Sequence, residues 1–215
     1  MIQLSNNGLR FEDAQIEEAR REYAGTNCVF LPQFLSQTIH ARLLEKLAAT
    51  RFLTKFEADG DSEFGKVLFV PPNEPVIFMF HLLLNNPNLF ELVRRITDCA
   101  RIGNFSGRIH RSQAGGKHEI DWHGDNADYR LVGLTLNLGT ERFAGGEFQL
   151  REKNSEKIIR RIGQTEAGDA FIFRISPDLQ HCLTALNAGT RTVGVGWFRS
   201  EPDFKTFAKN YFQSF

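Results

Sequence analysis

The sequence predicts an α+β protein with a mainly β core. From residue 103 onward, short runs rich in β-branched and aromatic residues alternate with Gly, Asp and Asn, a pattern typical of a closed or sandwiched antiparallel sheet. Before residue 103, apolar residues recur at helical spacing. A length of 215 residues suits a single domain in three parts: a helix-rich buttress at 1–102, a β core at 103–200 and a terminal helix at 201–215.

The N-terminal part is expected to form four helices and three strands. Ser36 has the character of a helix N-cap, and Pro75 and Pro87 suit the first turns of two further helices. Helices with one apolar face most often buttress a sheet. The expected helices span residues 11–23, 36–49, 76–85 and 87–100, and the expected strands span residues 28–31, 52–57 and 66–70.

The C-terminal part is expected to be built from strands, with one helix at its end. Phe204, Phe207 and Tyr211 would pack that helix, at residues 202–212, against the sheet. The expected strands span residues 103–113, 118–125, 131–138, 146–151, 157–162, 170–175, 181–186 and 190–199.

Composition excludes some classes of partner. Lys+Arg and Asp+Glu both number 26, and this balance argues against a dominant nucleic-acid footprint. The three cysteines, Cys28, Cys99 and Cys182, form no motif and indicate reduced thiols. The longest apolar run, residues 76–84, is too short to span a bilayer, and the start lacks the pattern of a signal peptide. We therefore expect a cytoplasmic protein without nucleic-acid or membrane partners.

His123 and Asp125 form the motif around which the chain is organised. Residues two apart on a strand point to the same face, so both side chains can reach one point. An imidazole and a carboxylate are two thirds of the facial triad that binds non-haem Fe(II) and leaves coordination positions open. A distant His must complete the set, and His181 follows a strand-like run.

Arg191 lies ten residues beyond His181. Residues 187–189, Asn-Ala-Gly, are typical of a short hairpin turn, which would pair Ala185 with Arg191 and His181 with Val195. His181 and Arg191 would then share one face, about 13 Å apart along the sheet. The guanidinium could bind the far carboxylate of a small dicarboxylate whose near end lies on the metal.

These residues together resemble the Fe(II)/2-oxoglutarate-dependent dioxygenases, and among them the prolyl-hydroxylase-like branch. His123-x-Asp125, His181 and Arg191 carry the resemblance, which covers about residues 103–200. Further segments that look like those of the family are residues 107–118, 131–138, 145–148 and 168–173.

The resemblance implies a fold, a reaction and a set of roles. The fold would be a double-stranded β-helix, or jelly roll, buttressed by the N-terminal helices. His123, Asp125 and His181 would bind Fe(II), and Arg191 would bind the distal carboxylate of 2-oxoglutarate. The protein would be an enzyme that uses O₂ to hydroxylate a C–H bond while 2-oxoglutarate is converted to succinate and CO₂, and ascorbate could stimulate it. The iron carboxylate of Asp125 favours hydroxylation over halogenation.

Asn137 is a second candidate for cosubstrate binding. The prolyl-hydroxylase-like branch often has a Tyr near this position, and this chain has Asn instead. The amide could bond the distal carboxylate or could simply be a strand-end residue. A Tyr that the branch has before the His-x-Asp motif is also absent here, so the resemblance does not imply a prolyl substrate.

The sequence leaves the substrate and some alternatives open. A small molecule or an amino-acid or peptidyl group fits the resemblance, whereas a nucleic-acid base is disfavoured because no basic, aromatic-interleaved segment is present. One alternative is a metal- and 2-oxoglutarate-binding sensor without turnover. Another is a cupin-like metalloprotein that does not use 2-oxoglutarate. In the simplest alternative, His123 and Asp125 belong to a surface turn.

Overall fold

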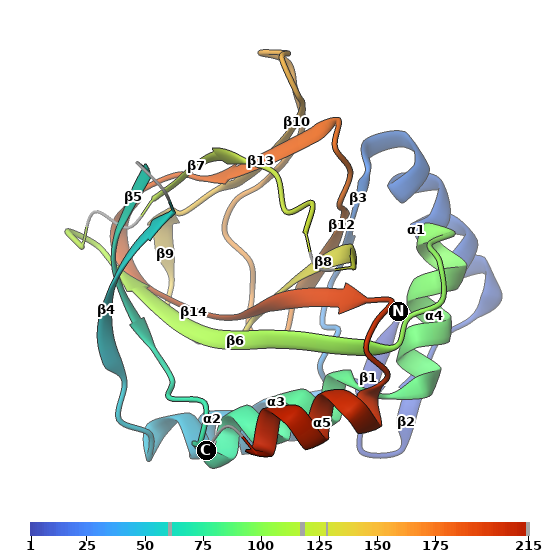
Figure 1. The fold of residues 1–215 in the computed structure, drawn as a ribbon, viewed down its shortest axis with the longest axis horizontal. Coiled ribbons are helices and arrows are strands. Elements are labelled where there is room, and N and C mark those ends of the chain that lie inside the picture. Colours follow the sequence, from blue (N-terminus) through green and yellow to red (C-terminus); the bar gives the residue numbers. More distant parts are fainter. Residues whose placement is uncertain (60–61, 117–118, 128, 214–215) are drawn as a thin grey trace.

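The computed structural model describes residues 1–59, 62–116, 119–127 and 129–213. Two antiparallel sheets face one another, and helices cover the outer side of the larger sheet (Figure 1). The strands are β1 (Gln3–Ser5), β2 (Gly8–Arg10), β3 (Cys28–Leu31), β4 (Leu53–Asp59), β5 (Ser62–Phe69), β6 (Asn104–Gln113), β7 (Ile120–His123), β8 (Arg130–Asn137), β9 (Phe143–Gly145), β10 (Phe148–Glu152), β11 (Ile158–Ile162), β12 (Ala170–Arg174), β13 (Leu179–Leu183) and β14 (Leu186–Arg199). The helices are α1 (Asp13–Thr26), α2 (Gln37–Ala48), α3 (Pro75–Leu84), α4 (Pro87–Thr97) and α5 (Phe204–Gln213).

The two sheets confirm the predicted α+β class with a jelly-roll core. The larger sheet has the strand order β3-β12-β8-β14-β6-β5-β4, and the smaller sheet has the order β11-β10-β13-β7. Strand β9 pairs with the first residues of β14. Three strands of the larger sheet, β3, β4 and β5, come from the first 102 residues. The N-terminal part therefore extends the β core as well as buttressing it.

Several helix ends lie where local chemistry predicts them. Ser36 is the N-cap of α2, and its hydroxyl accepts a hydrogen bond from the Ile39 N–H. Pro75 and Pro87 are the first residues of α3 and α4, where a missing N–H costs nothing. These signals act within one turn of the chain, so tertiary packing does not change where these helices begin.

Two apolar clusters hold the layers together. The larger cluster fills the space between the helices and the outer side of the larger sheet, and the smaller cluster lies between the sheets. Phe80 of α3 packs against Gly194 of β14, where an added Cβ would lie 2.4 Å from the nearest atom of the Phe80 ring. Glycine at position 194 therefore lets the helix approach the sheet closely.

Asn85 marks the break between α3 and α4. Its amide nitrogen donates to the carbonyl oxygens of His81 and Phe105, and its amide oxygen accepts from the Phe105 N–H. The two helices are bent by 56° at this break. Among the described residues no single helix has the length and apolar character to cross a membrane. Only α3 and α4 taken together, across their bend, have that length and apolar character.

The predicted hairpin at residues 187–189 is wrong. Strand β14 already begins at Leu186, and its first residues pair with β9, with Leu186 opposite Gly145 and Gly189 opposite Phe143. Strand β13 instead pairs with β10 and β7 in the smaller sheet. The backbone groups that a hairpin would have used are therefore taken by β9, and the chain crosses from one sheet to the other.

Candidate active site

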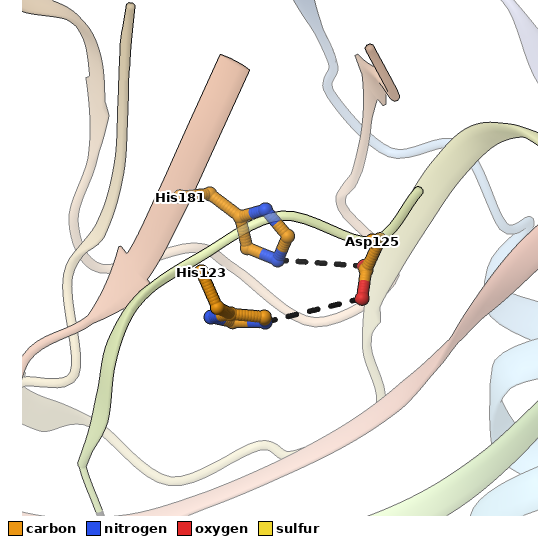
Figure 2. A group of neighbouring side chains, drawn as sticks. All are labelled: His123, Asp125 and His181. Atoms are coloured by element: carbon orange, nitrogen blue, oxygen red, sulfur yellow. Dashed lines mark ion pairs between the residues drawn. The ribbon is translucent and has the colours of Figure 1, made fainter. Parts of the chain in front are cut away.

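His123, Asp125 and His181 lie together between the two sheets. Each offers one donor atom, and the three atoms all lie within 4.8 Å of one another. His123 Nε2 is 3.9 Å from Asp125 Oδ1, and His181 Nε2 is 3.5 Å from Asp125 Oδ2 (Figure 2). Donors about 2.0–2.2 Å from one divalent metal ion are separated by similar distances. The side chains are thus gathered as a metal site requires.

The two histidines are neighbours in the smaller sheet. His123 ends β7, and His181 lies at the centre of β13 directly opposite it. Their ring centroids are 4.2 Å apart. The ladder register therefore fixes the spacing of the two imidazoles, while 57 residues separate them in the sequence.

Asp125 reaches the site from a loop, and this corrects the predicted strand 118–125. Strand β7 ends at His123, and the Ala127 N–H donates to the Asp125 carbonyl oxygen at 2.8 Å, which turns the chain. The start of the predicted strand, at residue 118, lies outside the described residues. The argument from strand periodicity therefore does not explain why Asp125 faces the histidines.

Both imidazoles direct Nε2 towards Asp125. His123 Nδ1 lies 2.8 Å from the Asp121 carbonyl oxygen, so Nδ1–H donates there and Nε2 keeps its lone pair facing the site. Burial, and after it the nearby His123, lower the pKa of His181 to about 4, although Asp125 acts in the opposite direction. His181 is therefore unprotonated at neutral pH. Two imidazole nitrogens and one carboxylate oxygen are the donor set of a non-haem iron site.

A cavity of about 120 Å³ opens beside the three side chains. Its polar lining includes Thr135 of β8 and Arg108 and His110 of β6, which share one face of β6. The apolar lining residues are Ile120, Leu134, Phe148, Phe173, Leu183 and Val195. The site is therefore an apolar pocket with polar groups at a few positions, as is usual for a ligand-binding cavity.

Arg191 lies in the same cavity, on the opposite sheet from His181. It is paired across the ladder with Ser112 and is 5% exposed. Within the described part of the chain, its guanidinium has no hydrogen-bond or ion-pair partner, and the guanidinium carbon lies 5.8 Å from the centroid of the Phe143 ring. Burial lowers the pKa of Arg191 to about 10, so it stays charged at neutral pH. A buried charge without a partner is costly, and an anionic ligand would compensate it.

Asn137 has partners within the protein. Its amide nitrogen donates to the Thr165 carbonyl oxygen at 2.7 Å, and its amide oxygen accepts from the Gly139 N–H at 3.0 Å. Asn137 is buried and is not among the residues that line the cavity. Of the two interpretations of Asn137, this geometry favours the residue that organises the end of β8.

Two site residues were not anticipated from the sequence. Trp197 Nε1 donates to Asp125 Oδ2 at 2.7 Å, and Arg130 Nη1 donates to Asp125 Oδ1 at 3.2 Å. A signal for Trp197 existed, because it follows Arg191 by six residues and period two places both on one face of β14. The sequence around Arg130 carries no such signal.

Comparisons with known proteins find relatives by structure only. No protein-family model matches the chain, and no curated protein sequence matches it. A 2OG-Fe(II) oxygenase family oxidoreductase from Burkholderia pseudomallei is 15% identical, with a TM-score of 0.68 over 94% of this chain and 98% of that one.

Two further solved structures are similar over most of their length. A prolyl hydroxylase from Trichoplax adhaerens, in complex with a hypoxia inducible factor peptide fragment, is 16% identical with a TM-score of 0.59 over 88% of this chain and 94% of that one. The α-ketoglutarate-dependent epimerase SnoN from nogalamycin biosynthesis is 13% identical with a TM-score of 0.60 over 86% of this chain and 82% of that one. At these identities the likeness establishes the fold, and the chain has the jelly-roll fold of the 2OG-Fe(II) oxygenases, including prolyl hydroxylases.

Proposed function

We propose that this protein is an Fe(II)- and 2-oxoglutarate-dependent dioxygenase that hydroxylates a C–H bond of a small molecule or of an amino-acid or peptidyl group. One observation carries the proposal: a single cavity contains both the His123–Asp125–His181 triad and the buried guanidinium of Arg191, which has no hydrogen-bond or ion-pair partner among the described residues. The triad suits a metal ion, and the guanidinium suits a carboxylate. A ligand that offers a metal-chelating end and a distal carboxylate matches both, and 2-oxoglutarate is such a molecule.

The residues have separate tasks in this proposal. His123, Asp125 and His181 hold the metal and leave three positions open. Arg191 binds the distal carboxylate in a buried environment, where a charge-assisted pair is strong. The apolar wall excludes water from the reacting centre. When bound, the metal and cosubstrate supply the oxidation itself, in which 2-oxoglutarate and O₂ give succinate, CO₂ and a hydroxylated product.

The substrate class in this proposal follows from the cavity and from the structural neighbours. The triad and Arg191 line one partly open cavity, which a small molecule or one group of a larger molecule can enter. The Trichoplax neighbour carries a peptide fragment, and SnoN is named in complex with nogalamycin RO, a small molecule. Both kinds of substrate can present one group to a buried centre, which supports a small-molecule or peptidyl substrate.

The proposal is tested by anaerobic Fe(II) titration with and without 2-oxoglutarate, followed by visible absorption. The charge-transfer band of a keto acid chelated to Fe(II) should appear only with both components. Arg191→Met should weaken 2-oxoglutarate binding while Fe(II) still binds. Arg111→Met is the matched control, because Arg111 donates to Thr192 Oγ1 and stacks over Phe52 outside the cavity.

Other outcomes lead to other functions. Absence of Fe(II) binding would contradict the metal site. Binding of Fe(II) without the band, and without an effect of Arg191→Met, would favour a cupin-like metalloprotein. A band with neither O₂ uptake nor succinate formation across small-molecule and peptide panels would favour a sensor.

A further inference from the structure

Asp125 is engaged on both of its carboxylate oxygens by donors that are not metal ligands. Trp197 Nε1 is 2.7 Å from Oδ2, and Arg130 Nη1 is 3.2 Å from Oδ1. The side chain of Asp125 is 12% exposed and that of Arg130 is 21% exposed. These hydrogen bonds are therefore partly shielded from water, and the bond from Arg130 is charge-assisted.

The two donors also hold each other. The Arg130 guanidinium carbon lies 3.7 Å from the centroid of the Trp197 ring, as in a cation–π stack. Arg130 begins β8 and Trp197 lies near the end of β14, so both come from the larger sheet. Asp125 lies in the loop after β7, a strand of the smaller sheet. The pair thus ties the one ligand that no strand positions to the sheet opposite the histidines.

Such a tie matters because a carboxylate can bind a metal ion in two ways. A carboxylate that is free to turn can chelate through both oxygens and then occupies two coordination positions. Each carboxylate oxygen can accept more than one partner, so an N–H donor on each oxygen of Asp125 leaves metal binding open but fixes the orientation of the carboxylate plane. With two imidazoles, one-oxygen binding leaves three of six positions open, and two-oxygen binding leaves two.

We propose that Arg130 and Trp197 are positioning residues that hold the carboxylate of Asp125 in one orientation as a metal ligand, and so fix how many coordination positions it occupies. This inference rests on the proposed function, because it assumes that His123, Asp125 and His181 bind a metal ion. Neither residue contacts the reacting atoms in this assignment; both act through Asp125. Hydrogen-bond partners of metal ligands typically contribute about 10–100-fold to metal affinity.

The chain contains a matched control for this pair. Trp122, the only other tryptophan, has the Arg151 guanidinium carbon 4.0 Å from its ring centroid. Trp122 neighbours His123 on β7 but is not among the residues that line the cavity. The same stack of Arg on Trp therefore occurs twice, once against the carboxylate of Asp125 and once away from it.

The test measures Co(II) affinity by calorimetry and coordination number by the intensity of Co(II) d–d absorption, neither of which requires activity. Trp197→Phe and Arg130→Gln should each weaken Co(II) binding about 10–100-fold and change the d–d intensity. Trp122→Phe and Arg151→Gln should leave both unchanged. In an Asp125→Ala background, Trp197→Phe should have no further effect on Co(II) affinity. If Trp197 had only a structural role, its replacement would weaken Co(II) binding whether or not Asp125 is present.

The possible outcomes distinguish failure of the positioning role of Arg130 and Trp197 from failure of the proposed function. If the unchanged protein binds no Co(II), the proposed metal site itself fails. If it binds Co(II) and both Trp197→Phe and Arg130→Gln bind equally well with the same spectrum, the positioning role is overturned and the proposed function stands. Equal weakening by Trp197→Phe with and without Asp125 would also overturn it. Should Trp197→Phe not fold, Arg130→Gln and its partial rescue by Arg130→Lys decide the question.

Discussion

Asp125 and Arg191 are opposite charges in one cavity, and the protein treats them differently. Asp125 has both histidines, Arg130 and Trp197 around its two oxygens. Arg191 is more deeply buried than Asp125 and has no charged partner among the described residues. A charge surrounded by donors is held in one orientation, whereas a buried charge without partners leaves its hydrogen bonds for a ligand. The comparison separates the part of the site that the protein completes from the part that awaits a ligand.

The largest expected effect is on 2-oxoglutarate affinity in Arg191→Met. Loss of one partner of a buried, hydrogen-bonded charge pair costs about 2–5 kcal/mol, and therefore we expect the dissociation constant to rise at least about 30-fold. Calorimetry in the presence of Mn(II), which does not turn over, would measure it. An unchanged dissociation constant would mean that Arg191 does not bind the carboxylate.

Asn137→Ala should lower stability and leave cosubstrate binding intact. The substitution removes a hydrogen-bond partner of the Thr165 carbonyl oxygen and of the Gly139 N–H, which should lower the free energy of unfolding by about 1–3 kcal/mol. We expect the melting temperature to fall by about 2–4 °C for each kcal/mol, compared with an exposed control, Asn88→Ala. A selective loss of 2-oxoglutarate affinity would instead assign Asn137 to the cosubstrate.

Arg191→Met should cost the ligand-free protein little stability. In the part of the chain that the structure describes, Arg191 has no hydrogen-bond or ion-pair partner to lose, and methionine removes a buried charge, so we expect a change within about 1 kcal/mol or a gain. Urea unfolding without metal or keto acid would measure the free energy of unfolding. A loss of several kcal/mol would show that the guanidinium is structural and would weaken the contrast with Asp125.

Stability in mild acid should depend on His181. The pKa of His181 is about 4 in the folded protein, below the value of 6.5 for an exposed histidine. Between these values the unfolded chain binds more protons, so stability falls as the pH drops through 6.5 and levels off below about 4. His81, whose pKa burial also lowers, contributes in the same direction.

Unfolding of the metal-free protein at stepped pH values would check this expectation. His181→Gln should reduce the loss of stability between about pH 6.5 and pH 4, and the contribution of His81 should remain. A pH dependence that is unchanged in His181→Gln would contradict the assignment of a low pKa to this imidazole.

The sequence alone predicted most of the helices and strands and pointed to the side chains at the centre of the site. Ser36, Pro75 and Pro87 marked helix starts that the structure bears out, because caps and proline act within one turn of the chain. His123, Asp125, His181 and Arg191 could be chosen because few residue types bind metal ions and carboxylates, and their spacing resembled a known family.

Only the tertiary structure decided how those side chains meet. Asp125 faces the histidines through a turn after β7, although the sequence predicted that it shares a strand with His123. Arg191 faces His181 from the opposite sheet, although the predicted hairpin placed the two residues on one sheet. Strand pairing over long separations depends on which backbone partners compete, as when β9 takes the residues at 186–189. The hydrogen bonds from Arg130 and Trp197 to Asp125 likewise follow from no local sequence pattern, because they join three segments that only tertiary packing brings together.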